Sequence, residues 1–105
     1  MSQYHIVLCT CPDNTVAQQI AATLVEEKLA ACVNLLPGVV SVYQWQGELC
    51  RDTEVQMIIK TTSGKLDAAF ERMLSLHPYD VPEWLVLDPT TGNPDYLNWI
   101  KSSLT

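Results

Sequence analysis

The chain has 105 residues, of which 48% are hydrophobic and 17% charged, so we expect one folded domain over residues 1–105. The formal net charge of −6 argues against nucleic acid and anionic membranes as partners. The sequence holds no apolar run near the ~18 residues that cross a bilayer, and its start lacks the features of a secretion signal. Four cysteines then indicate free thiols in a reducing compartment, and we expect a cytoplasmic protein.

The N-terminal part predicts a strand followed by a helix. Residues 4–11, YHIVLCTC, are rich in β-branched and aromatic types, which favours a strand. Apolar residues then recur at helical spacing and predict a helix over 15–28. Thr15 and Gln18 match a capping box, with Asp13 and the residue after it as competing caps.

The middle of the chain predicts a long hairpin. The segment 31–47, ACVNLLPGVVSVYQWQG, reads as extended, with a bulge or kink at Pro37-Gly38. Residues 47–53, GELCRDT, are expected to form the connection. Residues 54–62, EVQMIIKTT, form the returning strand.

The last third predicts a helix, a strand and a final helix. Ser63 is the expected cap of a helix that stops near His77, because Pro78 disfavours helical geometry in the residue before it. Residues 82–88, PEWLVLD, read as a strand. A short helix then begins after Asn93 as its cap, with proline at the first helical position.

The predicted order is βαββαβ plus a C-terminal helix. This is the ferredoxin-like split βαβ fold of the α+β class, an antiparallel sheet with helices on one face. Such a sheet should alternate apolar and polar residues, yet the runs IVL, MII and WLVL are continuous. We therefore expect the face without helices to be buried in a homo-oligomer, with the aromatic segment VYQWQ as an interlocking element.

Two groups of residues are candidates for chemistry. Cys9 and Cys11 point to the same face of their strand, where they either share a soft metal such as Cu(I) or pack as small core residues. The segment LHPYDVPE holds an imidazole, a phenol and carboxylates in a loop stiffened by two prolines. It forms either a metal or small-anion pocket or an ordinary loop whose polar groups satisfy the backbone.

Lys60 interrupts the apolar strand MIIKTT. Its side chain either reaches the rim of the sheet or meets an anion or Glu83. The sequence offers no Ser-His-Asp or Cys-His arrangement with a supporting third group and no Gly-rich phosphate loop. We therefore do not expect an enzyme.

Several motifs together resemble one known family. LAAC.N..PG..S.Y.W.G, then E..M.IKT, then HPYDVPE, with a closing Y..W, is similar to the CutA divalent-cation-tolerance family over essentially the whole chain. The resemblance implies a ferredoxin-like protomer, a tightly packed homotrimer and a cytoplasmic bacterial protein linked to tolerance of copper and other divalent metals. It also implies an architecture similar to PII signalling trimers, with clefts between subunits.

The resemblance further implies a copper site. In relatives, this site is associated with the cysteine of the first strand and two consecutive histidines before PY. Cys9 and His77 occupy the first and last of these positions, whereas Leu76 replaces the first histidine.

Three functions follow as hypotheses. The leading one is a homotrimer that binds copper or another divalent metal ion and contributes to metal tolerance, with Cys9 and His77 as ligands. The alternative is a PII-like signalling trimer whose inter-subunit clefts bind a small anionic metabolite or a partner protein. Its expected cleft residues are Trp45, Lys60, Tyr79 and Glu83. The third is a structural scaffold whose metal binding is adventitious thiol chemistry.

Overall fold

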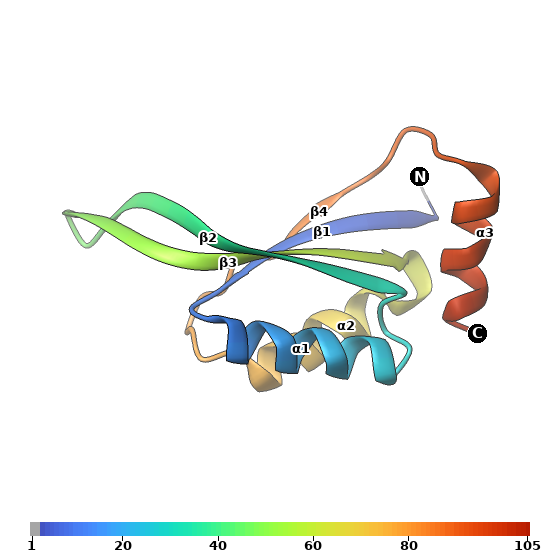
Figure 1. The fold of residues 1–105 in the computed structure, drawn as a ribbon, viewed down its shortest axis with the longest axis horizontal. Coiled ribbons are helices and arrows are strands. Elements are labelled where there is room, and N and C mark those ends of the chain that lie inside the picture. Colours follow the sequence, from blue (N-terminus) through green and yellow to red (C-terminus); the bar gives the residue numbers. More distant parts are fainter. Residues whose placement is uncertain (1–2) are drawn as a thin grey trace.

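A four-stranded antiparallel sheet organises residues 3–105, the part of the chain that this computed structural model describes (Figure 1). The strand order β2-β3-β1-β4 and the helix after β1 and after β3 confirm the predicted α+β, ferredoxin-like arrangement. In chain order the elements are β1 (Tyr4–Cys11), α1 (Asn14–Glu26), β2 (Cys32–Trp45), β3 (Glu48–Thr62), α2 (Ser63–Leu76), β4 (Leu85–Leu87) and α3 (Pro94–Ser103).

Helices α1 and α2 cover one face of the sheet, and α3 lies beyond one end of it (Figure 1). Side chains in β1 alternate between this covered face and the opposite one, so every second residue of the strand is buried. The core beneath the two helices consists of Val7, Cys9, Cys11, Ala17, Ile20, Leu24, Ala30, Val55, Met57, Ile59, Ala69 and Met73. Both cysteines of the CTC motif therefore belong to the main core.

The opposite face of the sheet is apolar and has no helical layer within residues 3–105. Strand register places Ile6 beside Leu87 and Leu8 beside Leu85 on this helix-free face. Leu85 remains 56% exposed and Leu87 47% exposed. The continuous apolar runs in the sequence thus correspond to a face that one chain leaves uncovered.

The β2–β3 hairpin is longer than predicted and extends well beyond the body of the domain (Figure 1). The expected connection at 47–53 was wrong, because β3 already begins at Glu48 and pairs with β2 from its first residue. A two-residue turn at Gln46-Gly47, with positive φ at both positions, joins the strands. The predicted bulge is confirmed, since the register shifts between Leu36 and Val39.

Element boundaries were predicted with mixed success. Helix α2 ends at Leu76 as expected, and Asn93 caps α3 by accepting a hydrogen bond from the Asp95 N–H. Ser63 was expected to be a cap but is the first residue of α2. Strand β4 is shorter than the predicted 82–88, because Trp84 leaves the sheet to pack its ring against Phe70 on α2, 5.4 Å between centroids.

The cap of α1 is Asp13 and not Thr15. The Asp13 Oδ1 atom accepts a hydrogen bond from the Val16 N–H at 2.9 Å, and the helix starts one residue earlier than predicted. This side chain satisfies one of the backbone donors that a helix leaves free at its first turn.

We expect Asp13→Ala to lower the free energy of unfolding by about 1 kcal/mol, because the Val16 N–H loses its acceptor. Chemical denaturation monitored by circular dichroism measures the change. Asp13→Asn retains a capping oxygen and serves as the matched control, with a much smaller loss expected. An equal or larger loss in Thr15→Ala would show that the capping box governs this end of the helix.

Candidate functional site

The structure places Cys11, and not Cys9, in contact with His77. The Cys11 Sγ atom lies 3.8 Å from His77 Nε2 and 3.9 Å from the thioether sulfur of Met57. The Cys9 Sγ atom instead lies 4.0 Å from the Thr10 carbonyl oxygen. Two sulfur atoms and one imidazole nitrogen therefore meet around Cys11 beneath the helices.

His77 holds this region through both of its ring nitrogens. Nε2 lies 2.7 Å from the Thr10 carbonyl oxygen, which can only accept, so Nε2 carries a proton. Nδ1 lies 3.1 Å from the Tyr79 backbone nitrogen, which can only donate, so Nδ1 supplies its lone pair. His77 is thus a neutral imidazole whose ring nitrogens are both engaged. A metal ion would bind it only after one of these bonds is released.

The two core thiols differ in how readily they ionise, because the interaction with Cys9 lowers the pKa of the Cys11 thiol. Interaction with the neighbouring Cys11 thiol, followed by burial, raises the pKa of the Cys9 thiol above its ordinary value. Metal ions bind thiolates, so metal binding here would release protons and strengthen as the pH rises. All four cysteines are free thiols.

Within residues 3–105, no three His, Cys, Asp or Glu side chains gather closely enough to share a metal ion. The cluster around Cys11 reaches three donors only when the Met57 thioether is included. Thiol and thioether sulfurs are soft ligands that suit Cu(I), whereas hard divalent ions prefer oxygen. The donors present therefore fit copper in its reduced state best.

A cavity of about 640 Å³ lies between the hairpin and the loop that follows α2. It brings together three of the four expected cleft residues, Trp45, Tyr79 and Glu83. The remaining lining is Thr10, Tyr43, Glu54, Pro78, Asp80, Val81 and Pro82. Residues from β1, β2, β3 and one loop thus form a single open-sided pocket.

Lys60 does not line this cavity. It lies six residues beyond Glu54 on β3, about 20 Å along an extended strand. Its ammonium nitrogen sits 5.7 Å from the centroid of the Tyr96 ring, beside a second cavity of about 150 Å³. Of the alternatives for Lys60, a contact with Glu83 is not formed within the described chain, and the Glu83 carboxylate accepts a hydrogen bond from Gln56 at 3.2 Å.

Glu54 and Tyr43 are among the cavity residues that sequence reasoning missed. Glu54 stands opposite Val39, directly after the bulge, where the hairpin enters the body of the domain. Its carboxylate is buried and accepts a hydrogen bond from the Tyr79 hydroxyl at 2.6 Å. Glu54 is the first residue of the motif E..M.IKT, and this position could have marked it as a candidate. The motif does not indicate that Tyr79 is its hydrogen-bond partner.

Two phenols of the cavity are hydrogen-bonded to carboxylates. The hydroxyl of Tyr43 donates to Asp52, and this bond raises the pKa of Tyr43 to about 12. Burial, followed by the hydrogen bond to Glu54, raises the pKa of Tyr79 as well. Both phenols therefore stay protonated over the physiological pH range and act as hydrogen-bond donors.

We expect Tyr43 to ionise near pH 12 in the folded protein and Asp52→Asn to lower its pKa towards 10, because the charged acceptor is lost. Ultraviolet difference titration of Asp52→Asn against Asp52→Asn/Tyr43→Phe isolates this phenol. The raised pKa also means that the native state holds this proton longer than the unfolded state. Its contribution to stability is complete below pH 10 and is lost as the pH rises towards 12. Ionisation of Tyr43 at an ordinary pKa in the parent protein would contradict the geometry.

No helix within residues 3–105 is long and apolar enough to cross a membrane. The family model of the CutA1 divalent ion tolerance protein matches residues 5–103. The divalent-cation tolerance protein CutA of Citrobacter koseri is 52% identical over 99 residues, covering 94% of this chain and 86% of that protein.

Solved structures agree with this match. CutA from Xylella fastidiosa has a TM-score of 0.96 at 42% identity, covering 99% of this chain and 100% of that one. A CutA from Archaeoglobus fulgidus, described as a periplasmic divalent cation tolerance protein, has a TM-score of 0.93 at 32% identity, covering 97% of this chain and 99% of that one. The chain therefore belongs to the CutA1 divalent ion tolerance family.

Proposed function

We propose that this protein is a cytoplasmic homotrimer that binds copper or another divalent metal ion and contributes to metal tolerance. Its role is binding and not catalysis. Membership of the divalent ion tolerance family supports the general role. The observation that carries the metal-binding proposal is the contact of Cys11 with both Met57 and His77 in the core.

Copper is the proposed metal because of the chemistry of the donors. Cys9 and His77 are the ligands implied by the family resemblance, and the geometry adds Cys11 and Met57 to the proposed set. Leu76 stands where relatives carry a further histidine, so sulfur has a larger share of the donors here. We propose that the sulfur atoms bind reduced copper first and that His77 joins only after giving up its bond to Thr10.

The proposed trimer rests on the helix-free face of the sheet. Apolar side chains from β1, β3 and β4 meet there without cover from the same chain, and an exposed apolar face of this kind is typical of a protein interface. The long hairpin supplies further exposed apolar surface at Val40, Val42 and Trp45. Free cysteines support the cytoplasm as location. One relative is described as periplasmic, so cell fractionation is the direct check.

The alternative, a PII-like trimer that binds a small anionic metabolite, receives less support. The cavity of about 640 Å³ is large enough for a metabolite. Its described lining, however, carries three carboxylates and no lysine, arginine or histidine. An anion would be repelled by such a lining within one chain.

We expect Cys11→Ser to weaken Cu(I) binding by roughly 10–100-fold, because a soft sulfur ligand is replaced by a hydroxyl. Competition with a chromogenic Cu(I) chelator under anaerobic conditions measures the affinity. Cys9→Ser and His77→Ala are expected to weaken binding too, with a smaller effect for His77→Ala because the imidazole joins last.

Cys50→Ser is the matched control, since it removes a thiol from the hairpin, far from this cluster. Circular dichroism of each variant verifies that the fold is intact. Unchanged Cu(I) affinity in both Cys9→Ser and Cys11→Ser would remove the cluster from the proposed function.

We expect sedimentation equilibrium to give three times the chain mass of 11.7 kDa. Leu85→Glu is expected to dissociate the assembly, because it places a charge on the helix-free face without disturbing the core of one chain. Leu74→Glu, a matched change on the outer surface of α2, should leave the mass unchanged. A monomeric parent protein, or dissociation by Leu74→Glu alone, would contradict this assembly.

A further inference from the structure

Three side chains from separate parts of the chain form a Ser-His-Asp arrangement at the start of α2. His5 Nδ1 lies 2.6 Å from Asp88 Oδ1, and His5 Nε2 lies 2.8 Å from Ser63 Oγ. Both distances suit hydrogen bonds that join a nucleophile to its base and the base to an orienting group. Spacing along the sequence does not predict this arrangement, because the residues belong to β1, to α2 and to the loop after β4.

The order of the hydrogen bonds sets the role of each group. An ionised Asp88 carboxylate can only accept, so Nδ1 of His5 carries a proton. In the neutral ring Nε2 then supplies its lone pair, and the Ser63 hydroxyl donates to it. The Gln3 carbonyl oxygen is a second acceptor for this hydroxyl, at the longer distance of 3.4 Å. His5 is therefore placed to take the Ser63 proton, while Asp88 stabilises the imidazolium that forms.

Ser63 stands where a strand passes directly into a helix. β3 ends at Thr62 and α2 begins at Ser63. The first turn of a helix leaves backbone N–H groups without partners inside the helix, and the Thr62 side chain caps none of them. A Cβ added to Gly64 would meet no atom of residues 3–105 within 4 Å, apart from its chain neighbours and its own helix backbone. This turn therefore offers open space and N–H donors for an oxyanion beside Ser63.

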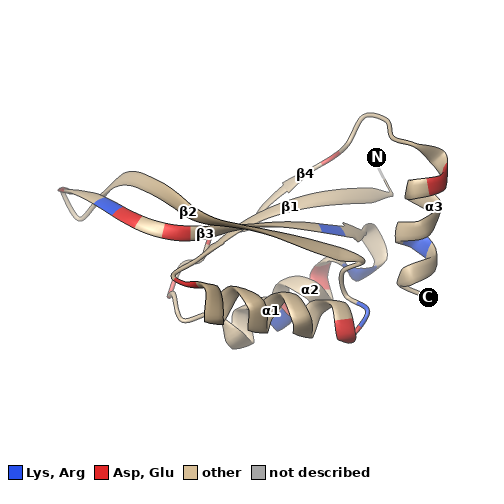
Figure 2. Cartoon of the chain, in the orientation of Figure 1, with Lys and Arg blue, Asp and Glu red and all other residues tan. Residues whose placement is uncertain are grey.

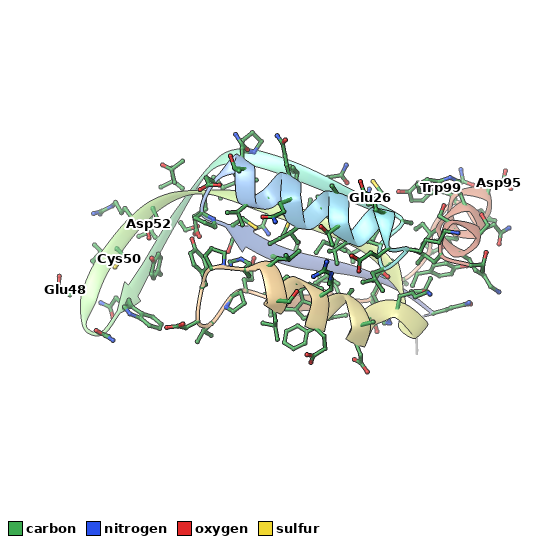
Figure 3. All side chains as sticks on the ribbon, turned by 90° about the horizontal axis from the view of Figure 1, so that it is seen from below. Glu26, Glu48, Cys50, Asp52, Asp95 and Trp99 are labelled. Atoms are coloured by element: carbon green, nitrogen blue, oxygen red, sulfur yellow. The ribbon has the colours of Figure 1, made fainter. Side chains whose placement is uncertain are left out.

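The arrangement lies away from the surfaces assigned to assembly. His5 shares the helix-covered face with the buried residues at alternate positions of β1. The start of α2 lies at the end of the sheet that carries α3, far from the hairpin side chains Glu48, Cys50 and Asp52 (Figure 3). His5 is buried, whereas Ser63 is exposed. A small reagent can thus reach the hydroxyl while the base stays shielded from water.

The acidic part of β3 is also distant from this position. Its carboxylates, Glu48, Asp52 and Glu54, all lie in the hairpin half of the strand (Figure 2). Ser63 follows the other end of the strand, so screening by salt weakens the repulsion between these carboxylates and an oxyanion there.

We propose that Ser63 is an activated nucleophile that accepts the acyl group of a small activated ester. Ser63 Oγ forms a bond to the carbonyl carbon, and its proton passes to His5 Nε2. The carbonyl oxygen takes up the negative charge beside the N–H groups of the first helical turn. The bond from the carbon to the leaving-group oxygen then breaks, and that oxygen takes the proton from His5. The products are acylated Ser63 and the free alcohol or phenol, so no further reactant is needed.

This reactivity goes beyond the proposed metal binding and shares no side chain with it. The proposed copper ligands are Cys9, Cys11, Met57 and His77. We therefore expect Ser63→Ala to leave Cu(I) affinity unchanged, and the two proposals can fail independently.

Incubation of the assembled protein with p-nitrophenyl acetate tests the proposal. We expect an acetyl group on Ser63, located by peptide mapping, and a matching release of p-nitrophenolate. Ser63→Ala should abolish this part of the release, and His5→Gln should slow it by about 100-fold, because the base is lost. An alkyl fluorophosphonate, which loses fluoride to an activated serine, should label the same hydroxyl and traps it even where water removes the acetyl group.

Ser75→Ala is the matched control, since Ser75 lies near the end of the same helix and its hydroxyl donates to the Arg72 carbonyl oxygen at 2.6 Å. It should leave the acylation rate within about twofold. Asp88→Asn should slow acylation by roughly tenfold, since the group that orients His5 loses its charge. Asp88→Glu keeps the charge and should recover part of the rate, which a merely structural role would not produce.

Three results would overturn the proposal. The first is a parent protein whose Ser63 stays unlabelled by both reagents at millimolar concentration, including p-nitrophenolate release that leaves acetyl groups on lysines alone. The second is labelling of Ser63 at the parent rate in His5→Gln or in Asp88→Asn. The third is equal slowing by Ser75→Ala. Because Ser63 and Asp88 are exposed, their variants keep the test decisive even where circular dichroism shows that His5→Gln is unfolded.

Discussion

The two hydrogen bonds of the His77 ring are the constraint on which both candidate sites depend. Nε2 ties the end of α2 to the Thr10 carbonyl in β1, and Nδ1 receives the backbone N–H of Tyr79. The bond to Thr10 holds the His77 ring over Cys11 at the edge of the core. The bond from Tyr79 fixes the start of the loop after α2. Because both partners are backbone groups, any side chain lacking two correctly placed nitrogens would leave at least one of them unsatisfied.

The side chains of β1 alternate between the two faces of the sheet. The strand therefore separates the buried thiols from the acidic cavity. Cys9 and Cys11 point towards the helices, where sulfur donors are shielded from water. Thr10, between them, borders the acidic cavity. The proposed soft-metal site and the acidic cavity thus lie on opposite faces of one strand without sharing a side chain. Only His77 connects them, through its bond to Thr10 and its ring contact with Tyr79, 4.7 Å between centroids.

Much of the fold could be predicted because local chemistry decided it. Pro78 ends α2 at the preceding turn, and the bulge needs the positive φ that Gly38 supplies. The hairpin turn escaped prediction because Gln46 occupies a position that asparagine, aspartate or glycine normally takes. The loop that its polar residues and two prolines made a candidate in the sequence does line the cavity.

The site was harder to predict because its residues meet only through register and rotamer choice. Periodicity placed Cys9 and Cys11 on one face, but only tertiary packing decides which of them reaches His77. Lys60 and Glu54 share β3 and the same face of it, yet six residues of extended chain separate them by about 20 Å. Spacing along one strand therefore predicts on which face of the sheet a side chain lies. It does not predict which residues of other elements that side chain contacts.

The single chain exposes an apolar sheet face and an acidic cavity, and different forces act on the two. The helix-free face exposes apolar side chains, whose burial is driven by the removal of surface from water and depends only weakly on ionic strength. Glu54, Asp80 and Glu83 place three carboxylates in the lining of the cavity, and long-range attraction of a cation to them weakens as salt increases. Moderate salt therefore distinguishes hydrophobic burial of the sheet face from electrostatic attraction to the cavity. It should leave an assembly on the apolar face in place while it weakens the attraction of cations to the acidic cavity.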